Sequence, residues 1–497
     1  MAYVRKVKTA SGATAVQIVH SNRRGSRKIE HIGSAHTADE LAALKKVAAD
    51  RLAAGQEELD LGLVAASGPL PITSSHMKVL WDTLHAVYTD LGFGAAAKGD
   101  NVFRDLVLAR IIEPTSKLDS LRVLEEVGVE SMSYRTLTRR LPGYASVEFR
   151  AGLSAACAAR ARIGPASLIL YDVTTLYFET DKADGFREPG FSKERRLEPQ
   201  ITVGLLTDAT GFPLRIEAFE GNRAETATMV PTLKRFMAAH NLEDVTVVAD
   251  AGMISAANKK EIEAAGLSFI LGDKMATVPY LISQWHTNNP DSTPPDGLVL
   301  TQPWPAGGKN KHRRDQVVYY RYSADRARRS VRGINEQVAK AEKAVAGQIP
   351  VKRNRFVTLR GADKSVNREL EQKARMLAGW KAYATNIVSP TPEFVIGSYH
   401  QLWRIEKSFR MSKSDLAARP IFHHSRDSIE AHLTIVFAAL AITRILEARS
   451  GWSVKKFVTT ARRYRAITIQ AGDHTINAVD PLPDDLQEAV RAITLAH

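Results

Sequence analysis

The sequence predicts an α/β protein whose centre is a mixed β-sheet with helices on both faces. The run of residues 167–178 (SLILYDVTTLYF) is rich in β-branched and aromatic residues, which suits a central strand. Further elements follow it at 201–207 (strand), 212–219 (strand), 225–240 (helix), 245–250 (strand), 256–265 (helix) and 268–271 (strand). The order β-β-β-α-β-α-β indicates a mixed sheet covered on both faces.

The composition limits the class of protein. A chain of 497 residues, 44% hydrophobic and 25% charged, is long enough for several domains. A net charge of +14 favours a polyanionic partner, nucleic acid before a membrane surface. The only cysteine is Cys157, so disulfides within the chain and thiolate metal sites are excluded. The N-terminus lacks an apolar signal region and the apolar run 433–442 is too short to span a bilayer, so we expect a cytoplasmic protein, associated with the nucleoid of a prokaryotic cell, with no membrane partner.

Two regions precede the sheet. Residues 1–68 begin with alternating, strand-like segments, which predict a β-hairpin with a turn at 22–25. An Ala-rich helix at 38–54 follows, with Thr37 as its N-cap. This basic module either contacts DNA or docks on the rest of the protein, and the sequence favours neither.

Residues 69–160 are predicted to be helical and to end in a short basic helix at 134–141. A helix, a turn containing glycine and this basic helix resemble a helix-turn-helix, although the turn is long for that motif. A plain helical bundle is the alternative. In the first interpretation, DNA is contacted by the arginines of the basic helix, Arg135, Arg139 and Arg140.

The sheet domain is predicted in two parts, 161–275 and 391–450, which are separated by an insertion at 276–390. Pro-, Gly- and Asn-rich pieces of the insertion surround a strand at 316–322 and a basic helix, so we expect it to be partly β. A segment at 380–387 is predicted to be its exit strand. The apolar segment 428–449 is predicted to be a long core helix, and the residues from 451 to 497 are expected to form a short basic tail.

Two aspartates stand where a folded sheet has little structural use for them. Asp172 lies inside the strand 167–178, where a lone buried charge would cost several kcal/mol. Asp250 ends the strand 245–250 and is followed by Ala-Gly, which lets a ligand approach closely. The predicted strand order can place the ends of these two strands side by side.

A third acid, Glu406, lies in the stretch YHQLWRIEKSFRMSK at 399–413. At helical period, Leu402, Ile405 and Phe409 form an apolar face that would seat a helix on a core. The other face carries Tyr399, Trp403, Glu406, Arg410 and Lys413. A surface helix with a Glu406–Arg410 ion pair is the alternative to a functional face.

Carboxylate ligands without cysteine suit Mg²⁺, or Mn²⁺ as a substitute. Two such ions about 4 Å apart would activate a water or a 3′-hydroxyl and stabilise the leaving oxygen in phosphodiester chemistry. Three convergent acids would therefore indicate an enzyme that acts on nucleic acid.

These residues carry a resemblance to a known family. The segments YDVTTLYFE, FEGN and VVADAGM and the spacing Y-x6-E-x6-K resemble the DDE transposases of bacterial insertion sequences, over residues 165–450. They are most similar to the branch with a Tyr-Arg-Glu-Lys signature and a β-rich insertion before its glutamate. The resemblance implies a ribonuclease-H-like catalytic domain.

The resemblance also implies roles for individual residues. It makes Asp172, Asp250 and Glu406 the catalytic ligands of two Mg²⁺ ions, and it makes Tyr399 and Lys413 contacts to transposon-end DNA. The implied activity is to bind the terminal inverted repeats of double-stranded DNA as a homodimer, to cleave the ends and to transfer the 3′-hydroxyls to target DNA.

The sequence departs from the signature at one position, where Leu402 replaces the arginine. Arg404 is two residues, about 200° of helix rotation, from Glu406 and points away from it. Arg410 is the better substitute by this geometry, and Trp403 is a further candidate for contact with DNA.

Other side chains are weaker candidates. Lys193, Arg195 and Arg196 lie in a loop after the first strand, where they either contact phosphates or belong to a solvated turn. Residues 220–222 shape a strand-to-helix turn or touch DNA.

Aromatic and histidine side chains add alternatives. Either Trp304 or Trp285 stacks on a flipped base or belongs to the core. The histidines His423, His424 and His432 are interpreted as structural rather than as metal ligands.

Three functions therefore compete. The first is a DDE transposase, and the second is a transposase-derived DNA-binding protein that no longer cuts, or a related ribonuclease-H-like nuclease. The third is a hydrolase that uses a carboxylate pair on a small substrate, which would leave the charge of +14 unexplained.

Overall fold

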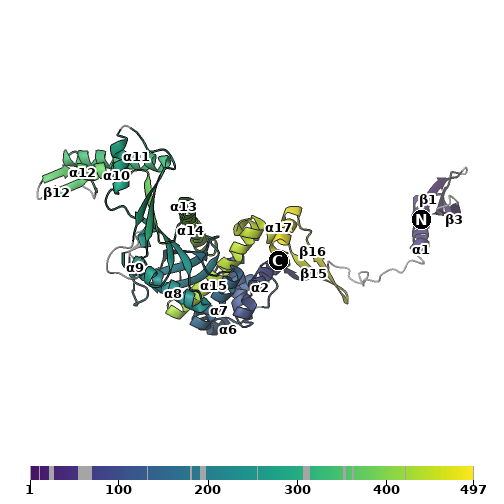
Figure 1. Ribbon diagram of the computed structural model, residues 1–497. Helices are drawn as coiled ribbons and strands as arrows, with labels where there is room; N and C mark the ends of the chain where they lie inside the picture. The colour runs from purple at the N-terminus through teal and green to yellow at the C-terminus, as the bar shows by residue number, and fades with distance from the viewer. Residues whose placement is uncertain are drawn as a thin grey trace. The chain divides into compact units, whose positions relative to one another are not determined.

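The computed structural model (Figure 1) describes residues 2–495. Outside the described residues lie 10–11, 22–26, 54–69, 131, 180–181, 191–197, 254–255, 291, 306–313, 351–353, 361–362, 420 and 422. The chain forms two compact units, Met1–Ser74 with Ile467–Ala478, and Ser75–Ala466 with Val479–His497.

The first unit begins with a three-stranded antiparallel sheet rather than a simple hairpin. Its elements are β1 (Ala2–Lys8), β2 (Thr14–Ser21), β3 (Arg27–Ala35) and α1 (Ala38–Ala53). The helix packs on the sheet, where Val16, Ile18 and Ala48 are buried together. Its predicted cap is confirmed, because Thr37 Oγ1 accepts a hydrogen bond from the Glu40 amide at 3.2 Å. The predicted turn at 22–25 lies outside the described residues.

A second small sheet joins distant parts of the chain. Its strand order is β16-β15-β4, with β4 (Ile72–His76), β15 (Ala466–Ala471) and β16 (His474–Val479). The described residues after 450 thus form regular elements, with α16 (Val454–Ala461) before these strands and α17 (Asp484–Thr494) after them.

The second unit contains the predicted mixed sheet. Five of its strands are β5 (Ser167–Tyr177), β6 (Gln200–Asp208), β7 (Pro213–Glu220), β8 (Val245–Ala249) and β9 (Ser268–Asp273). They lie in the order β7-β6-β5-β8-β9; β5 and β7 run antiparallel to β6, and β5, β8 and β9 run parallel. The predicted sheet and the neighbouring positions of its first and fourth strands are confirmed.

The insertion continues this sheet. Its strand β14 (Trp380–Thr385) pairs with β9, and β11 (Gln316–Tyr322) and β10 (Val299–Trp304) extend the sheet to eight strands. The three pairs β9–β14, β14–β11 and β11–β10 are antiparallel. The rest of the insertion comprises α10 (Tyr280–Asn288), α11 (Ala324–Val345), the hairpin β12 (Val357–Arg360) and β13 (Asp363–Val366), and α12 (Arg368–Met376). Figure 1 shows these helices gathered beyond the end of the long strands, and a separate apolar cluster around Phe356 holds them together.

Helices cover both faces of the sheet. Tyr171, which follows the buried Leu170 on β5, donates a hydrogen bond at 2.9 Å to Thr228, the residue before α8 (Met229–His240). The opposite face, where Thr174 and Leu176 point, packs against Phe409 and Leu433. The remaining elements over the sheet are α9 (Ala256–Ala264) and the short helices η3 (Glu225–Ala227) and η4 (Ala251–Met253).

The long apolar segment forms α15 (Arg426–Ser450). This is the one helix in the described part of the chain that is long and apolar enough to cross a membrane, and 89% of its apolar window is buried inside the protein. It packs against the helical region, which comprises α2 (Lys78–Asp90), α3 (Phe93–Ala96), α4 (Asn101–Ile112), α5 (Asp119–Glu126), α6 (Tyr134–Arg140), η2 (Leu141–Ala145) and α7 (Val147–Arg160). α15 is therefore a core helix, as the sequence predicts.

Candidate active site

The register of the sheet brings two of the predicted acids together. β5 and β8 pair in parallel up to Leu170 beside Val248. Two residues further on, the same register places Asp172 of β5 beside Asp250, the first residue after β8. Residues paired across neighbouring strands face the same side of a sheet, so both carboxylates belong to one face.

The third acid lies on a helix that packs against the same strand. α14 (Leu402–Arg410) contacts β5, and its residues Leu402, Ile405 and Phe409 are buried, so the predicted apolar face is confirmed. Glu406 is exposed on the other side of the helix. Among the described residues, no three His, Cys, Asp or Glu side chains are grouped so that they could hold a metal ion. Convergence of Glu406 with the two aspartates therefore stays a prediction.

Tyr399 links the glutamate helix region to the sheet. It lies on α13 (Pro392–His400), is only 4% exposed, and donates a hydrogen bond from its hydroxyl to Asp250 Oδ1. Burial, followed by the contact with Asp250, raises the pKa of the Tyr399 hydroxyl, so the hydroxyl keeps its proton and acts as a donor. The predicted contact of Tyr399 with DNA is not tested by this arrangement.

A glycine makes room for this hydrogen bond. Gly272 of β9 pairs with Tyr383 of β14 and, through the parallel register, follows the Ala249–Leu271 pair beside Asp250. A Cβ atom at Gly272 would lie 2.7 Å from the Tyr399 hydroxyl oxygen, closer than real contacts allow. The missing side chain at position 272 is therefore what lets Tyr399 cross β9 to reach Asp250.

A lysine that the sequence did not single out completes this group. Lys381 of β14 places its Nζ 4.1 Å from the centre of the Tyr399 ring. Burial lowers the pKa of Lys381, while the negative charges of Asp250 and Glu406 act in the opposite direction. The alternation in the segment WKAYAT puts Lys381 and Tyr383 on one face of a strand, but no local signal shows that this face meets the acids.

The stretch 399–413 is not one helix. α13 ends at His400, α14 begins at Leu402, and a π-helical turn, η5 (Met411–Asp415), contains Lys413. A single helical face from Tyr399 to Lys413 is therefore wrong as a geometric description, because the break at Gln401 and the wider final turn change the rotation between residues. Trp403 (57% exposed) and Arg410 are exposed, as contacts to DNA require.

Arg404 faces another part of the protein. Its Cβ lies 2.9 Å from where a Cβ at Gly211 would be, in the turn between β6 and β7, and its guanidinium lies 5.6 Å from the Trp403 ring. Arg404 thus packs on the sheet turn, which agrees with the prediction that it does not point toward Glu406.

The remaining predicted contacts fall in different places. Arg139 and Arg140 lie at the end of α6, where Arg140 forms an ion pair with Asp100 at 3.5 Å. Lys193, like Arg195 and Arg196, lies outside the described residues.

Residues 220–222 have a structural role. A Cβ at Gly221 would lie 2.0 Å from the Gln200 carbonyl oxygen, so this turn requires glycine. Glu220 forms an ion pair with Arg223 at 3.3 Å.

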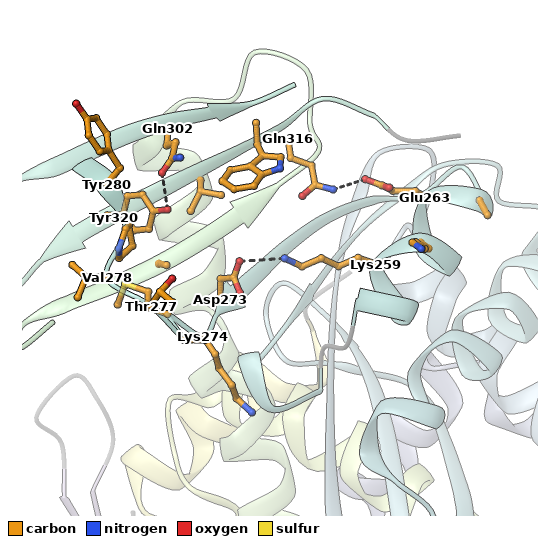
Figure 2. A pocket seen from close by; sticks show the side chains of 18 residues that line it. Lys259, Glu263, Asp273, Lys274, Thr277, Val278, Tyr280, Gln302, Gln316 and Tyr320 are labelled. Carbon is orange, nitrogen blue, oxygen red and sulfur yellow. Dashed lines mark hydrogen bonds and ion pairs between the residues drawn. The ribbon is translucent and has the colours of Figure 1, made fainter. Parts of the chain in front are cut away.

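A large cavity lies on the face of the sheet away from the aspartates. It has a volume of about 840 Å³ and is lined by residues of α9, the loop after β9 and strands β10 and β11. Figure 2 shows Asp273 and Tyr320 pointing into it, with Lys259 paired to Asp273 at 3.2 Å. Asp273 follows Gly272 along β9 and so faces the opposite side of the sheet. Trp304 lines this cavity and is about half exposed, so it does not belong to a core.

The fold and the acids together define a class of protein. A mixed sheet in the order β7-β6-β5-β8-β9, with a pair of aspartates on adjacent parallel strands and a glutamate helix against the first strand, matches the arrangement expected of a ribonuclease-H-like catalytic domain.

Comparison with known families identifies the chain more closely. The model of the transposase DDE domain matches residues 163–442, more than half of the chain, so the chain belongs to this family. It is a DNA transposase, a class of DNA-binding protein with nuclease chemistry that generally uses divalent metal ions.

Comparisons with individual proteins add little. A solved structure of the piggyBac transposase synaptic complex with hairpin DNA aligns at 12% identity and a TM-score of 0.37, covering 83% of this chain and 74% of that chain. No curated protein sequence matches this chain.

Proposed function

We propose that this transposase binds the terminal inverted repeats of an insertion sequence as a homodimer, cleaves its ends and joins the 3′-hydroxyls to target DNA with the aid of Mg²⁺. The observation that carries the proposal is the pair Asp172 and Asp250 on adjacent parallel strands, with the helix of Glu406 packed against the strand of Asp172. The family supplies the DNA substrate class.

The donor set fits a hard divalent cation. Two carboxylates on one face, with a third on α14, offer oxygen ligands of the kind that Mg²⁺ and Mn²⁺ prefer. When bound between these carboxylates, two such ions would activate the attacking oxygen and stabilise the leaving one.

Neighbouring residues orient the acids and receive the DNA. The Tyr399 hydroxyl holds Asp250 through a hydrogen bond, and Lys381 supplies positive charge beside both Asp250 and Glu406. Trp403 and Arg410, which are exposed on α14, and Lys413 in the following turn would contact the DNA ends.

Removal of the acids tests this site. We expect Asp172→Asn, Asp250→Asn and Glu406→Gln each to lower end cleavage about 1000-fold or more, because several kcal/mol of transition-state stabilisation is lost. Binding to end DNA should change little. Cleavage of labelled element ends in Mg²⁺ and a gel-shift assay measure the two effects.

The matched control is Asp325→Asn, which removes an exposed carboxylate of α11 and should leave cleavage unchanged. Cleavage by any of the three site variants at the wild-type rate would show that the acids are wrongly assigned.

A second function has one observation in its favour. Because no three acidic or histidine side chains of the described residues are grouped to hold a metal, a DNA-binding protein that no longer cuts remains the competing proposal. A strand-transfer assay with wild-type protein, end DNA and Mg²⁺ separates the two, since joined products form only in the first case.

A further inference from the structure

Four basic side chains meet far from the acids in sequence. They are Arg110 of α4, Lys117 in the turn before α5, His423 before α15 and His432 within α15; we call them the basic cluster. Lys117 Nζ contacts both ring nitrogens of His423, with Nδ1 at 3.3 Å. The rings of His423 and His432 lie 5.4 Å apart, and Arg110 lies within electrostatic reach of all three.

Two members of the cluster are buried, and one of its nitrogens has no hydrogen-bond partner among the described residues. Lys117 is 9% exposed and His432 is 4% exposed. His432 Nε2 lies 3.2 Å from the Ala418 carbonyl oxygen, so Nε2 carries the proton and donates. The other ring nitrogen, Nδ1, is buried and has no hydrogen-bond partner among the residues that the structure describes. Buried polar atoms of this kind cost free energy unless a ligand or water satisfies them.

No acid balances these charges. In the part of the chain that the structure describes, no carboxylate forms an ion pair with any member of the cluster. Burial lowers the pKa of Lys117 to about 7 and that of His423 to about 4, and the neighbouring charges that lower them further are all basic. The protein thus gathers basic groups that have no counter-ion among the described residues, and burial favours their neutral forms until a negative charge is added.

A bound anion would supply the negative charge that the basic cluster lacks. It would accept hydrogen bonds from Lys117 Nζ, from Arg110 and from protonated His432 Nδ1, and its charge would favour the protonated forms of these groups. A single phosphate presents several acceptor oxygens and matches such a set of donors.

The position of the cluster suggests how a phosphate would arrive. Ala418, which binds His432, lies with Lys413 beside Thr174 of β5, the strand of Asp172. Thr174 lies on the same face of the strand as Asp172, two residues further along. This nearness of Ala418 to the strand of Asp172 makes the DNA backbone one source of phosphate to test.

We propose that the basic cluster is a binding site for a phosphate group, supplied by the DNA backbone or by free phosphate. The site is distinct from the three acids and does not depend on their role as metal ligands. A structural hydrogen bond between neutral Lys117 and His423 is the competing explanation.

The first test uses the full-length protein, with sulfate as the probe because it keeps its charge between pH 6 and pH 9. Thermal unfolding is measured in sulfate and in chloride at equal ionic strength. At pH 6, sulfate should raise the Tm of the wild type more than that of Lys117→Met or His423→Gln. This difference between the wild type and the variants in the Tm rise caused by sulfate should shrink toward pH 9, because Lys117 then loses its proton.

The comparison in chloride alone separates the two explanations. If the lysine is an uncompensated cation, Lys117→Met should raise the Tm at pH 6, because an apolar chain of similar length replaces a buried charge. If Lys117 instead forms a structural hydrogen bond with His423, Lys117→Met should lower the Tm at pH 6. Lys340→Met, an exposed lysine on α11, is the matched control and should leave both Tm values unchanged.

The second test identifies the source of the phosphate. If it is the DNA backbone, Lys117→Met should reduce the slope of log affinity against log salt for end DNA by about 1, while Lys340→Met leaves it unchanged. If Lys117→Met leaves the slope unchanged but reduces the rise in Tm caused by sulfate, the site is assigned to free phosphate. A Lys117→Met variant with a lower Tm in chloride, the wild-type sulfate effect and an unchanged slope would overturn the proposal.

Discussion

At the scale of single residues, the hydrogen bond between Tyr399 and Asp250 depends on the absence of a side chain at position 272. Gly272 lies in the sheet between Asp250 and Tyr383, and the Tyr399 ring passes over it to reach the aspartate. Lys381 then lies over the tyrosine ring, so two strands, β9 and β14, and one helix, α13, each contribute a residue to the surroundings of Asp250. The aspartate is positioned by residues that are distant in sequence.

Removing the tyrosine hydroxyl should weaken catalysis without abolishing it. We expect Tyr399→Phe to lower end cleavage by about 10- to 100-fold, because a hydrogen bond to a charged group contributes about 1.5–3 kcal/mol. Affinity for end DNA should stay within about threefold of the wild type. Single-turnover cleavage and gel-shift titration measure these quantities. Loss of binding with normal cleavage of bound DNA would instead support a direct contact of Tyr399 with DNA.

A methyl group at position 272 should act through the same hydrogen bond. Gly272→Ala would place a Cβ 2.7 Å from the Tyr399 oxygen and push the ring away from Asp250. We expect cleavage by this variant to fall as in Tyr399→Phe, and the double variant to be no worse than either single variant. Additive losses in cleavage would show that Gly272 and Tyr399 act independently.

At the scale of elements, α15 is the core of the second unit. Its residues between Ile429 and Leu446 are almost all buried, against both the helical region and the acid face of the sheet. Its start is fixed by Ser425, whose hydroxyl accepts a hydrogen bond from the Ser428 amide at 3.3 Å, and its end by Gly451 with φ of +70°. The helix thus connects the two layers that position the glutamate helix.

A cavity in α15 should be costly. We expect Leu440→Ala to lower the free energy of unfolding by about 2–5 kcal/mol, because Leu440 is fully buried. The control Leu118→Ala removes an exposed side chain and should change stability by less than about 0.5 kcal/mol. Urea unfolding followed by circular dichroism measures both. Equal effects of the two substitutions would contradict the assignment of α15 as the core.

The sequence predicts regular elements better than their ends and partners. The hydrophobic pattern predicts β5, β11 and α15 closely, because each is long and its buried face repeats regularly. It does not reveal the break at Gln401, since the apolar residues Leu402, Ile405 and Phe409 all follow that position and their spacing says nothing about where the helix begins.

The partner residues around the site are also beyond local pattern. The aspartates could be found because a charge inside a hydrophobic strand is unusual, as at Asp172. Lys381 and Gly272 could not, because their importance comes from the pairing of β14 with β9, which joins segments more than 100 residues apart. Pairing over such distances leaves no local signal in the sequence.

At the scale of the whole molecule, charge sets the strength and the salt dependence of DNA binding. The chain carries 68 Lys and Arg against 54 Asp and Glu, and the large apolar helix that could suggest a membrane is buried. Contacts between basic side chains and phosphates release counter-ions from DNA, so binding weakens as salt is added.

We therefore expect affinity for end DNA to fall at least about 100-fold between 50 and 200 mM salt, as several phosphate contacts require. Fluorescence anisotropy with labelled end DNA, at salt concentrations across this range, gives the slope. An uncharged small molecule turned over at a rate that does not depend on salt would instead favour a hydrolase of small substrates.

The insertion shares its backbone ladder with the catalytic sheet, because β14 pairs with β9 from Ile270 to Asp273. A shortened protein without residues 276–390 would leave β9 with unpaired amide and carbonyl groups beside Asp250, and such a bare strand recruits other chains. The insertion interrupts the catalytic domain in sequence but covers the edge of its sheet. A minimal version of the enzyme therefore cannot be made by deleting it.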